Sequence, residues 1–178
     1  FTYPDFFDFT TADGVTLKGM ITLPWNFDEQ KKYPIIINGY GLAGSQMAAD
    51  WWGGRKYLWH QYMAQNGHII VSINNRQTGG RGKAFKNLGY KDLGKWLIND
   101  HIEAVNYLGK FPYADTSRVG VWGWSGGGYF TALALTKGAD YFTTGVSIAP
   151  VTDWRLYDTA YTELYMGLLS YNEAGYNS

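Results

Sequence analysis

The chain opens with a stretch in which apolar and polar residues alternate. Between residues 15 and 23, Val, Leu, Ile and Leu occupy one set of positions, and Thr, Lys, Met and Thr occupy the other. A period of two is typical of a strand with one face against a core. Asp13-Gly14 precedes this strand and is a turn signal, so we expect residues 7–10 to pair with it as a hairpin.

Further along the chain, short solid apolar runs replace the alternation. These runs lie at residues 35–37, 69–73, 119–122 and 145–148. Runs of this kind are typical of a parallel sheet that is covered on both faces. Helices are predicted between them, over residues 55–65, 97–108 and 127–136, and each has a glycine just past its end where a left-handed cap would lie. Strands alternating with helices predict an α/β fold with right-handed crossovers.

A length of 178 residues suits one domain. We predict that residues 1–24 form leading β-strands and that residues 33–178 form a βα core. The segment 75–94 is long for a connection and rich in glycine, charge and polar side chains. Its Gly79-Gly80-Arg81-Gly82 lacks the Lys-Ser/Thr ending of a phosphate loop, so we interpret it as a flexible connection.

Composition narrows the classes of function. The 15 Lys and Arg residues balance 15 Asp and Glu residues, which argues against binding to nucleic acid or to an acidic membrane surface. The absence of cysteine excludes a disulfide framework, a thiolate zinc site and a cysteine nucleophile. No apolar run approaches the roughly 20 residues of a membrane span. No metal motif and no dinucleotide-binding glycine motif occurs, so we expect no metal and no cofactor.

The strongest chemical signal is Gly123-Trp124-Ser125-Gly126-Gly127. It matches G-x-S-x-G between a predicted buried strand and a predicted helix, which is the context of the nucleophile elbow in α/β-hydrolases. We expect a strained turn that exposes the Ser125 hydroxyl, with the Gly126 N–H placed to donate to a developing oxyanion. The alternative interpretation is a glycine-rich turn with an incidental serine.

A serine nucleophile needs a base, usually a histidine that an Asp or Glu orients. In α/β-hydrolases the acid and then the histidine follow the serine along the chain. His60, His68 and His101 all precede Ser125, so we interpret all three as packed or surface histidines.

Three aspartates, Asp140, Asp153 and Asp158, do follow the serine. No strand is predicted after them that would place one at the edge of a sheet. The sequence therefore predicts an incomplete α/β-hydrolase fold, the front part of the domain without its last strands and helices. Since the chain starts at Phe1 and shows no signal peptide, we also expect it to begin inside a longer or processed polypeptide.

Several segments resemble the prolyl oligopeptidase superfamily, serine peptidase family S9. Residues 121–129 resemble the nucleophile segment of its dipeptidyl peptidase IV branch, and residues 149–167 resemble the segment that lines the proline pocket there. Residues 32–34, 39–41 and 75–82 also fit. The likeness runs from about Phe7 to the last residue.

The resemblance implies a serine exopeptidase that releases N-terminal dipeptides after Pro or Ala, with no cofactor. Ser125 matches the nucleophile, and Tyr40 matches a tyrosine whose hydroxyl completes the oxyanion hole with the Gly126 N–H. The residues that match the proline pocket are Val151, Trp154, Tyr157 and Tyr161. The last three lie at helical spacing, which predicts one aromatic face, although an ordinary core stripe has the same spacing.

The chain departs from the family pattern at three places. The position after the serine is commonly Tyr and is Gly126 here, residues 41–44 lack the usual Gly-Pro, and residues 94–97 are atypical where an acidic residue is common. The missing side chain at Gly126 predicts a roomier pocket with weaker preference for proline, unless an aromatic residue such as Tyr129 fills the gap.

The triad Asp and His of the family have no counterparts in this chain. The resemblance implies that a full-length protein supplies them in the missing C-terminal part of the catalytic domain, and that it adds a β-propeller and forms a homodimer. It also implies a periplasmic or secreted location. Two other functions stay open on the sequence: an esterase or acyl-peptidase on the same elbow, and a non-catalytic hydrolase-like binding domain.

Overall fold

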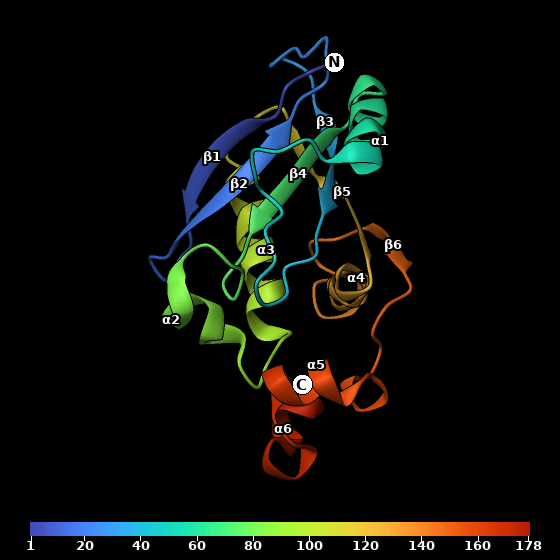
Figure 1. Ribbon diagram of the computed structural model, residues 1–178. Coiled ribbons are helices and arrows are strands. Elements are labelled where there is room, and N and C mark those ends of the chain that lie inside the picture. Colours follow the sequence, from blue (N-terminus) through green and yellow to red (C-terminus); the bar gives the residue numbers. More distant parts are fainter.

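The computed structural model describes all 178 residues, which form a six-stranded mixed sheet with helices on both faces (Figure 1). The strands are β1 (Asp5–Thr10), β2 (Thr16–Thr22), β3 (Tyr33–Asn38), β4 (Ile69–Asn74), β5 (Ala114–Trp124) and β6 (Thr144–Ile148). The longer helices are α1 (Gly54–Gln65), α3 (Lys95–Leu108) and α4 (Gly126–Thr136). The shorter ones are α2 (Gly82–Lys86), α5 (Thr159–Met166) and α6 (Glu173–Tyr176), with the 3-10 turns η1 (Asn87–Gly89), η2 (Trp154–Leu156) and η3 (Leu169–Tyr171). None of the helices has the length and apolar character needed to cross a membrane.

The strand order is β1-β2-β4-β3-β5-β6, and it confirms the predicted hairpin and the α/β core. β1 pairs with β2, and β2 with β4, in antiparallel register, whereas β3 is parallel to both β4 and β5, and β5 to β6. The hairpin turns at Gly14, whose φ of 85° suits a residue without a side chain. Helix α1 covers one face of the sheet, and α3 and α4 cover the other (Figure 1).

The central strands are buried, as their solid apolar runs predict. Every residue of β4 is buried, and the inward side chains of β3 and β5 are at most 2% exposed at Ile35, Ile37, Val119 and Val121. The same prediction is wrong for the last strand. β6 is the outer strand of the sheet, and its Val146 is 60% exposed. An apolar groove of about 430 Å³ lies beside it, between α1 and β6.

The glycines after the helices have two different physical roles. Gly67 follows α1 with a φ of 81°, which is the predicted left-handed cap. Gly109 follows α3 with a φ of −61°, so a left-handed cap is the wrong prediction there. Gly138 is not left-handed either; a Cβ at this position would press against Phe142 and Ile98. Gly138 therefore allows the chain to pack closely beneath the end of α4.

The connection between β4 and α3 begins with a buried stretch, and the flexibility of residues 79–82 stays a prediction. The segment contains α2 and η1, and its first four residues, 75–78, are at most 4% exposed. Arg76 explains this order. Its guanidinium Nε lies 2.9 Å from Asp100 Oδ1 on α3, its backbone N–H donates to Asp100 Oδ2 at 2.6 Å, and it also pairs with Asp13 in the hairpin turn. The side chain stacks over the Trp96 ring at 3.7 Å from the ring centre. The ion pair thus ties the leading hairpin to the core.

We expect Asp100→Asn to lower the free energy of unfolding by about 3–5 kcal/mol, because it leaves the buried Arg76 cation without its carboxylate. Urea denaturation of the protein would measure this loss. Asp8→Asn is the matched control, since it breaks the exposed Lys18–Asp8 pair, 3.1 Å apart, and exposed pairs contribute at most about 1 kcal/mol. Equal losses in the two variants would contradict the account of Arg76.

Candidate active site

Ser125 lies at the junction of β5 and α4, in the tight turn that its motif predicts. Its backbone has φ 55° and ψ −114°, a strained conformation for a residue with a side chain. Two hydrogen bonds hold this turn: the Ser125 N–H donates to the Ile148 carbonyl at 2.9 Å, and the Tyr129 N–H donates to the Ser125 carbonyl at 3.0 Å. The elbow is therefore fastened both to the end of β6 and to the first turn of α4.

Glycine is needed on either side of the serine because the chain passes close to the end of β3. A Cβ on Gly123 would overlap the Gly39 carbonyl oxygen and the backbone of Gly127. A Cβ on Gly127 would overlap the same Gly39 oxygen. These contacts bring the elbow against the loop that begins with Gly39 and Tyr40.

The Tyr40 ring lies against Gly126, the residue that follows the elbow serine. Gly126 is the first residue of α4, where a helix leaves its backbone N–H groups without carbonyl partners. The Cζ atom of Tyr40 lies 3.3 Å from the position that a Cβ on Gly126 would take. The structure thus brings together the tyrosine ring and the free N–H that the resemblance pairs in an oxyanion hole.

The four residues matched to the proline pocket follow β6, and one of them, Tyr161, neighbours Tyr40. Val151 and Trp154 are buried, at 8% and 5% exposed, whereas Tyr157 is 42% exposed. The rings of Trp154 and Tyr161 are stacked with centres 5.8 Å apart, and Tyr157 meets both edge-on. Burial raises the pKa of Tyr161, and the neighbouring Tyr40 adds to this rise. Tyr161 is therefore neutral at physiological pH.

The single helical face predicted for these aromatics is wrong in detail. Trp154 belongs to η2, and Tyr161 belongs to α5. The chain leaves the helical conformation at Tyr157 and Asp158, and the Asp158 carboxylate then caps α5 by accepting from the Tyr161 N–H at 2.8 Å. Two short helices joined at this corner make one aromatic surface.

The space above Gly126 is occupied, which contradicts the roomier pocket. A Cβ on Gly126 would overlap the Leu42 side chain, which is 2% exposed. Tyr129 does not fill this space; its ring packs edge-on against Trp154, with ring centres 5.2 Å apart. The sequence does contain a signal for this packing: the loop 41–44, which lacks the usual Gly-Pro, has Leu42, and this departure occurs together with the one at Gly126.

None of the histidines contacts the elbow serine through a hydrogen bond. His101 is fully buried against the Phe130 ring, its Nδ1 lies 2.7 Å from the Leu97 carbonyl, and burial lowers its pKa to about 4. The His68 Nδ1 lies 3.2 Å from the Met63 carbonyl. Both are packed histidines, as the order of the chain predicts.

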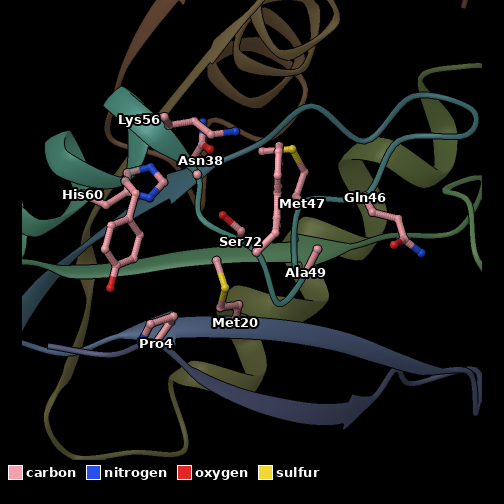
Figure 2. A pocket seen from close by; sticks show the side chains of 12 residues that line it. Pro4, Met20, Asn38, Gln46, Met47, Ala49, Lys56, His60 and Ser72 are labelled. Carbon is pink, nitrogen blue, oxygen red and sulfur yellow. The ribbon is translucent and has the colours of Figure 1, made fainter.

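His60 points into a separate cavity of about 40 Å³ between α1 and the sheet, shown in Figure 2. Asn38, Ser72 and Lys56 line the same cavity. Burial, together with the nearby Lys56 cation, lowers the pKa of His60 to about 4. This histidine is neutral and lies apart from the elbow, whose serine does not line the cavity.

Two of the carboxylates that follow the serine, Asp153 and Asp158, bond to residues close to them in the chain. Asp153 accepts from the Arg155 side chain at 2.9 Å, and this pairing lowers the pKa of the carboxyl group. Asp158 caps α5. Neither carboxylate bonds to a histidine.

The fold and the elbow define a class of protein, the α/β-hydrolases with a serine nucleophile motif. Residues 56–178 match the model of the prolyl oligopeptidase family, and the chain belongs to this family. The chain is 41% identical over 172 residues to a protein of Trichophyton verrucosum named "probable dipeptidyl-aminopeptidase B". It is 38% identical over 176 residues to the "probable dipeptidyl peptidase 4" of Aspergillus flavus.

The solved structure of Porphyromonas gingivalis dipeptidyl peptidase 4 superimposes on 99% of this chain with a TM-score of 0.94 and 34% identity. The alignments cover only part of each relative. They take in 94% and 97% of this chain but 19% and 23% of the two fungal proteins, and 25% of the bacterial one. The chain thus corresponds to a part of the α/β-hydrolase domain of dipeptidyl peptidase 4-like proteins.

Because Leu42 fills the space above Gly126, we expect changes at the two positions to depend on each other. Leu42→Ala should cost about 2–5 kcal/mol of stability through the cavity that it leaves. Gly126→Ala should also destabilise the protein, by forcing Leu42 to move. In the double variant the new methyl group enters the space that Leu42 vacates, so its cost should fall below the sum of the single costs by about 0.5–3 kcal/mol. Urea denaturation measures the free energy of unfolding of all three variants. If the loss in the double variant equals the sum of the two single losses, this packing is contradicted.

Proposed function

We propose that this chain is the nucleophile-bearing part of a serine exopeptidase that releases dipeptides from peptide N-termini after Pro or Ala. One observation carries the proposal: directly after the strained Ser125, the Gly126 backbone lies against the Tyr40 ring, and Tyr40 neighbours Tyr161 of the aromatic cluster formed by Trp154, Tyr157 and Tyr161. The names of the relatives support the same reaction. The proposal concerns a longer protein, since the chain spans about a fifth of the two fungal relatives.

In this reaction the Ser125 Oγ attacks the carbonyl carbon of the second residue, and a histidine outside residues 1–178 takes its proton. Negative charge then develops on the former carbonyl oxygen, where the Tyr40 hydroxyl and the Gly126 N–H donate to it. Collapse of the tetrahedral intermediate releases the shortened peptide as an amine, which receives the proton from the histidine. Water then hydrolyses the acyl-enzyme and frees the dipeptide.

The aromatic cluster suits a proline ring at the second residue. Flat rings offer apolar contact to a compact side chain, and the stacked pair of Trp154 and Tyr161 has little freedom to adapt. Leu42 takes the space above Gly126, so the proposed pocket excludes bulky side chains on that side. One added methylene in a pocket of this kind changes the free energy of the transition state by about 1–3 kcal/mol.

The remaining parts of the enzyme are proposals from the resemblance. They are a C-terminal segment with the triad Asp and His, a β-propeller, and a second subunit in a homodimer. A periplasmic or secreted location is proposed on the same basis. The alternative with the same chemistry is an esterase or acyl-peptidase. Comparing kcat/KM of the intact protein for aminoacyl-prolyl anilides and for short-chain esters separates this alternative from the exopeptidase. A preference for the esters would overturn the proposed exopeptidase.

In the intact protein, we expect Tyr40→Phe to lower kcat by about 10²–10³-fold with little change in KM, because one donor to the oxyanion is lost. Steady-state kinetics with a prolyl anilide measure both constants. Folding should survive the loss of one hydroxyl, which circular dichroism verifies. An unchanged kcat would place the second oxyanion donor elsewhere.

Residues 1–178 alone should label with a fluorophosphonate at least about 10³-fold more slowly than the intact protein, since loss of a triad member costs about 10⁴–10⁶ in rate. The rate of adduct formation, followed by intact mass, tests this. Labelling of the isolated chain at the rate of the intact protein would mean that its own residues supply the base.

A further inference from the structure

The carbonyl of Gly41, directly after Tyr40, is gripped by two buried amide side chains. Asn75 Nδ2 donates to the Gly41 oxygen at 3.0 Å, and Gln77 Nε2 donates to the same oxygen at 3.0 Å. Neither side chain is exposed to any measurable extent. Because a buried carbonyl with two donors cannot turn without losing both bonds, the peptide that follows Tyr40 is fixed in direction.

Gln77 is itself held in an uncommon state. Its φ is 77°, in the left-handed region that residues with a side chain rarely adopt. Its Nε2 also donates to the Leu93 carbonyl at 3.0 Å, its backbone N–H donates to the Phe85 carbonyl at 3.2 Å, and Gly89 packs against its amide. A strained residue persists only where its surroundings hold it, and such residues cluster at functional sites.

The two amides that hold the Gly41 carbonyl each have one polar atom without a hydrogen-bond partner. Asn75 Oδ1 and Gln77 Oε1 are buried and have no hydrogen-bond partner. Buried polar atoms are nearly always paired, so two unpaired amide oxygens on the side chains that hold one carbonyl point to a role other than stability. Stability alone would favour apolar side chains here.

The hydrogen bonds to the Gly41 carbonyl restrict Tyr40 because the peptide before Tyr40, at Gly39, is also fixed. The Gly39 N–H donates to the Trp122 carbonyl at 3.2 Å, and Gly39 touches the elbow glycines. Gly41 has a φ of 67°, and a Cβ there would overlap Leu97 and Asn75, so the loop has no room to shift. Tyr40 thus lies between two anchored peptides.

We propose that Gln77, with Asn75, is a positioning residue that sets the place of the Tyr40 hydroxyl for the oxyanion. This inference rests on the proposed function. Gln77 touches no reacting atom and acts only through the Gly41 carbonyl. Without the Gln77 hydrogen bond to the Gly41 carbonyl, Tyr40 can move. Misplacement of its hydroxyl by about 1 Å can lower the rate by up to about 100-fold.

The test is a double-mutant cycle on the intact protein with an aminoacyl-prolyl anilide. Gln77→Met keeps the length of the side chain and removes its donors. We expect kcat to fall about 10-fold or more with KM unchanged, and the same change in a Tyr40→Phe background to have no further effect on kcat, because the hydroxyl to be positioned is gone. Asn75→Asp, which turns the donor into an acceptor, should behave in the same way and replaces Gln77→Met if that variant fails to fold.

Asn74→Leu is the matched control. Its amide is also buried and bonded to backbone, but to Met47 and Ala48, further along the loop from Tyr40. It should lower the unfolding temperature and leave kcat unchanged. Equal effects of Gln77→Met with and without the Tyr40 hydroxyl, or an effect on KM alone, would overturn the positioning role. A Tyr40→Phe variant with full kcat would instead overturn the oxyanion role in the proposed function, and this inference with it.

Discussion

The close approach of the elbow to the end of β3 is the constraint on which the rest of the site depends. Gly123 and Gly127 both press on the Gly39 carbonyl, at a distance that no side chain would permit. This approach accompanies the strained turn of Ser125 and brings Gly126, the first residue of α4, against the Tyr40 ring. The elbow and a tyrosine from a distant part of the chain are thereby neighbours.

Around this point, fixed backbone does most of the positioning. Ser125 is bonded to the end of β6, and the loop after Tyr40 is gripped by buried amides. Behind that loop, the Arg76–Asp100 ion pair ties the segment after β4 to α3. Such preorganisation is what electrostatic stabilisation of an oxyanion requires, because the donors then need no rearrangement as charge develops.

Much of this arrangement could be predicted from the sequence, because its signals are local. The leading hairpin, the parallel core and the elbow each follow from a periodicity or a glycine motif. What could not be predicted depends on neighbours far along the chain. Polarity suggested a loose connection after β4, yet Arg76 and Gln77 are buried because they find partners on other elements. Likewise, the gap expected at Gly126 is closed by Leu42, which lies 84 positions earlier in the printed sequence.

The exposure of β6 has the same kind of cause. Its apolar run is that of an inner strand, but nothing in these residues pairs with its outer side or covers Val146. Sequence patterns report which side chains are suited to burial, and the fold decides which of them are covered.

The central claim is that Ser125, Tyr40 and the Gly126 N–H act on one tetrahedral centre. The most direct test is a crystal structure of the intact protein with an aminoacyl-boronoproline, whose boron mimics the tetrahedral carbon. The account predicts a covalent bond from boron to the Ser125 Oγ, with one boronate oxygen within hydrogen-bond distance of both the Tyr40 hydroxyl and the Gly126 N–H, and the proline ring against Trp154 and Tyr161. A boronate bound to another residue, or an oxygen turned away from Tyr40, would contradict it.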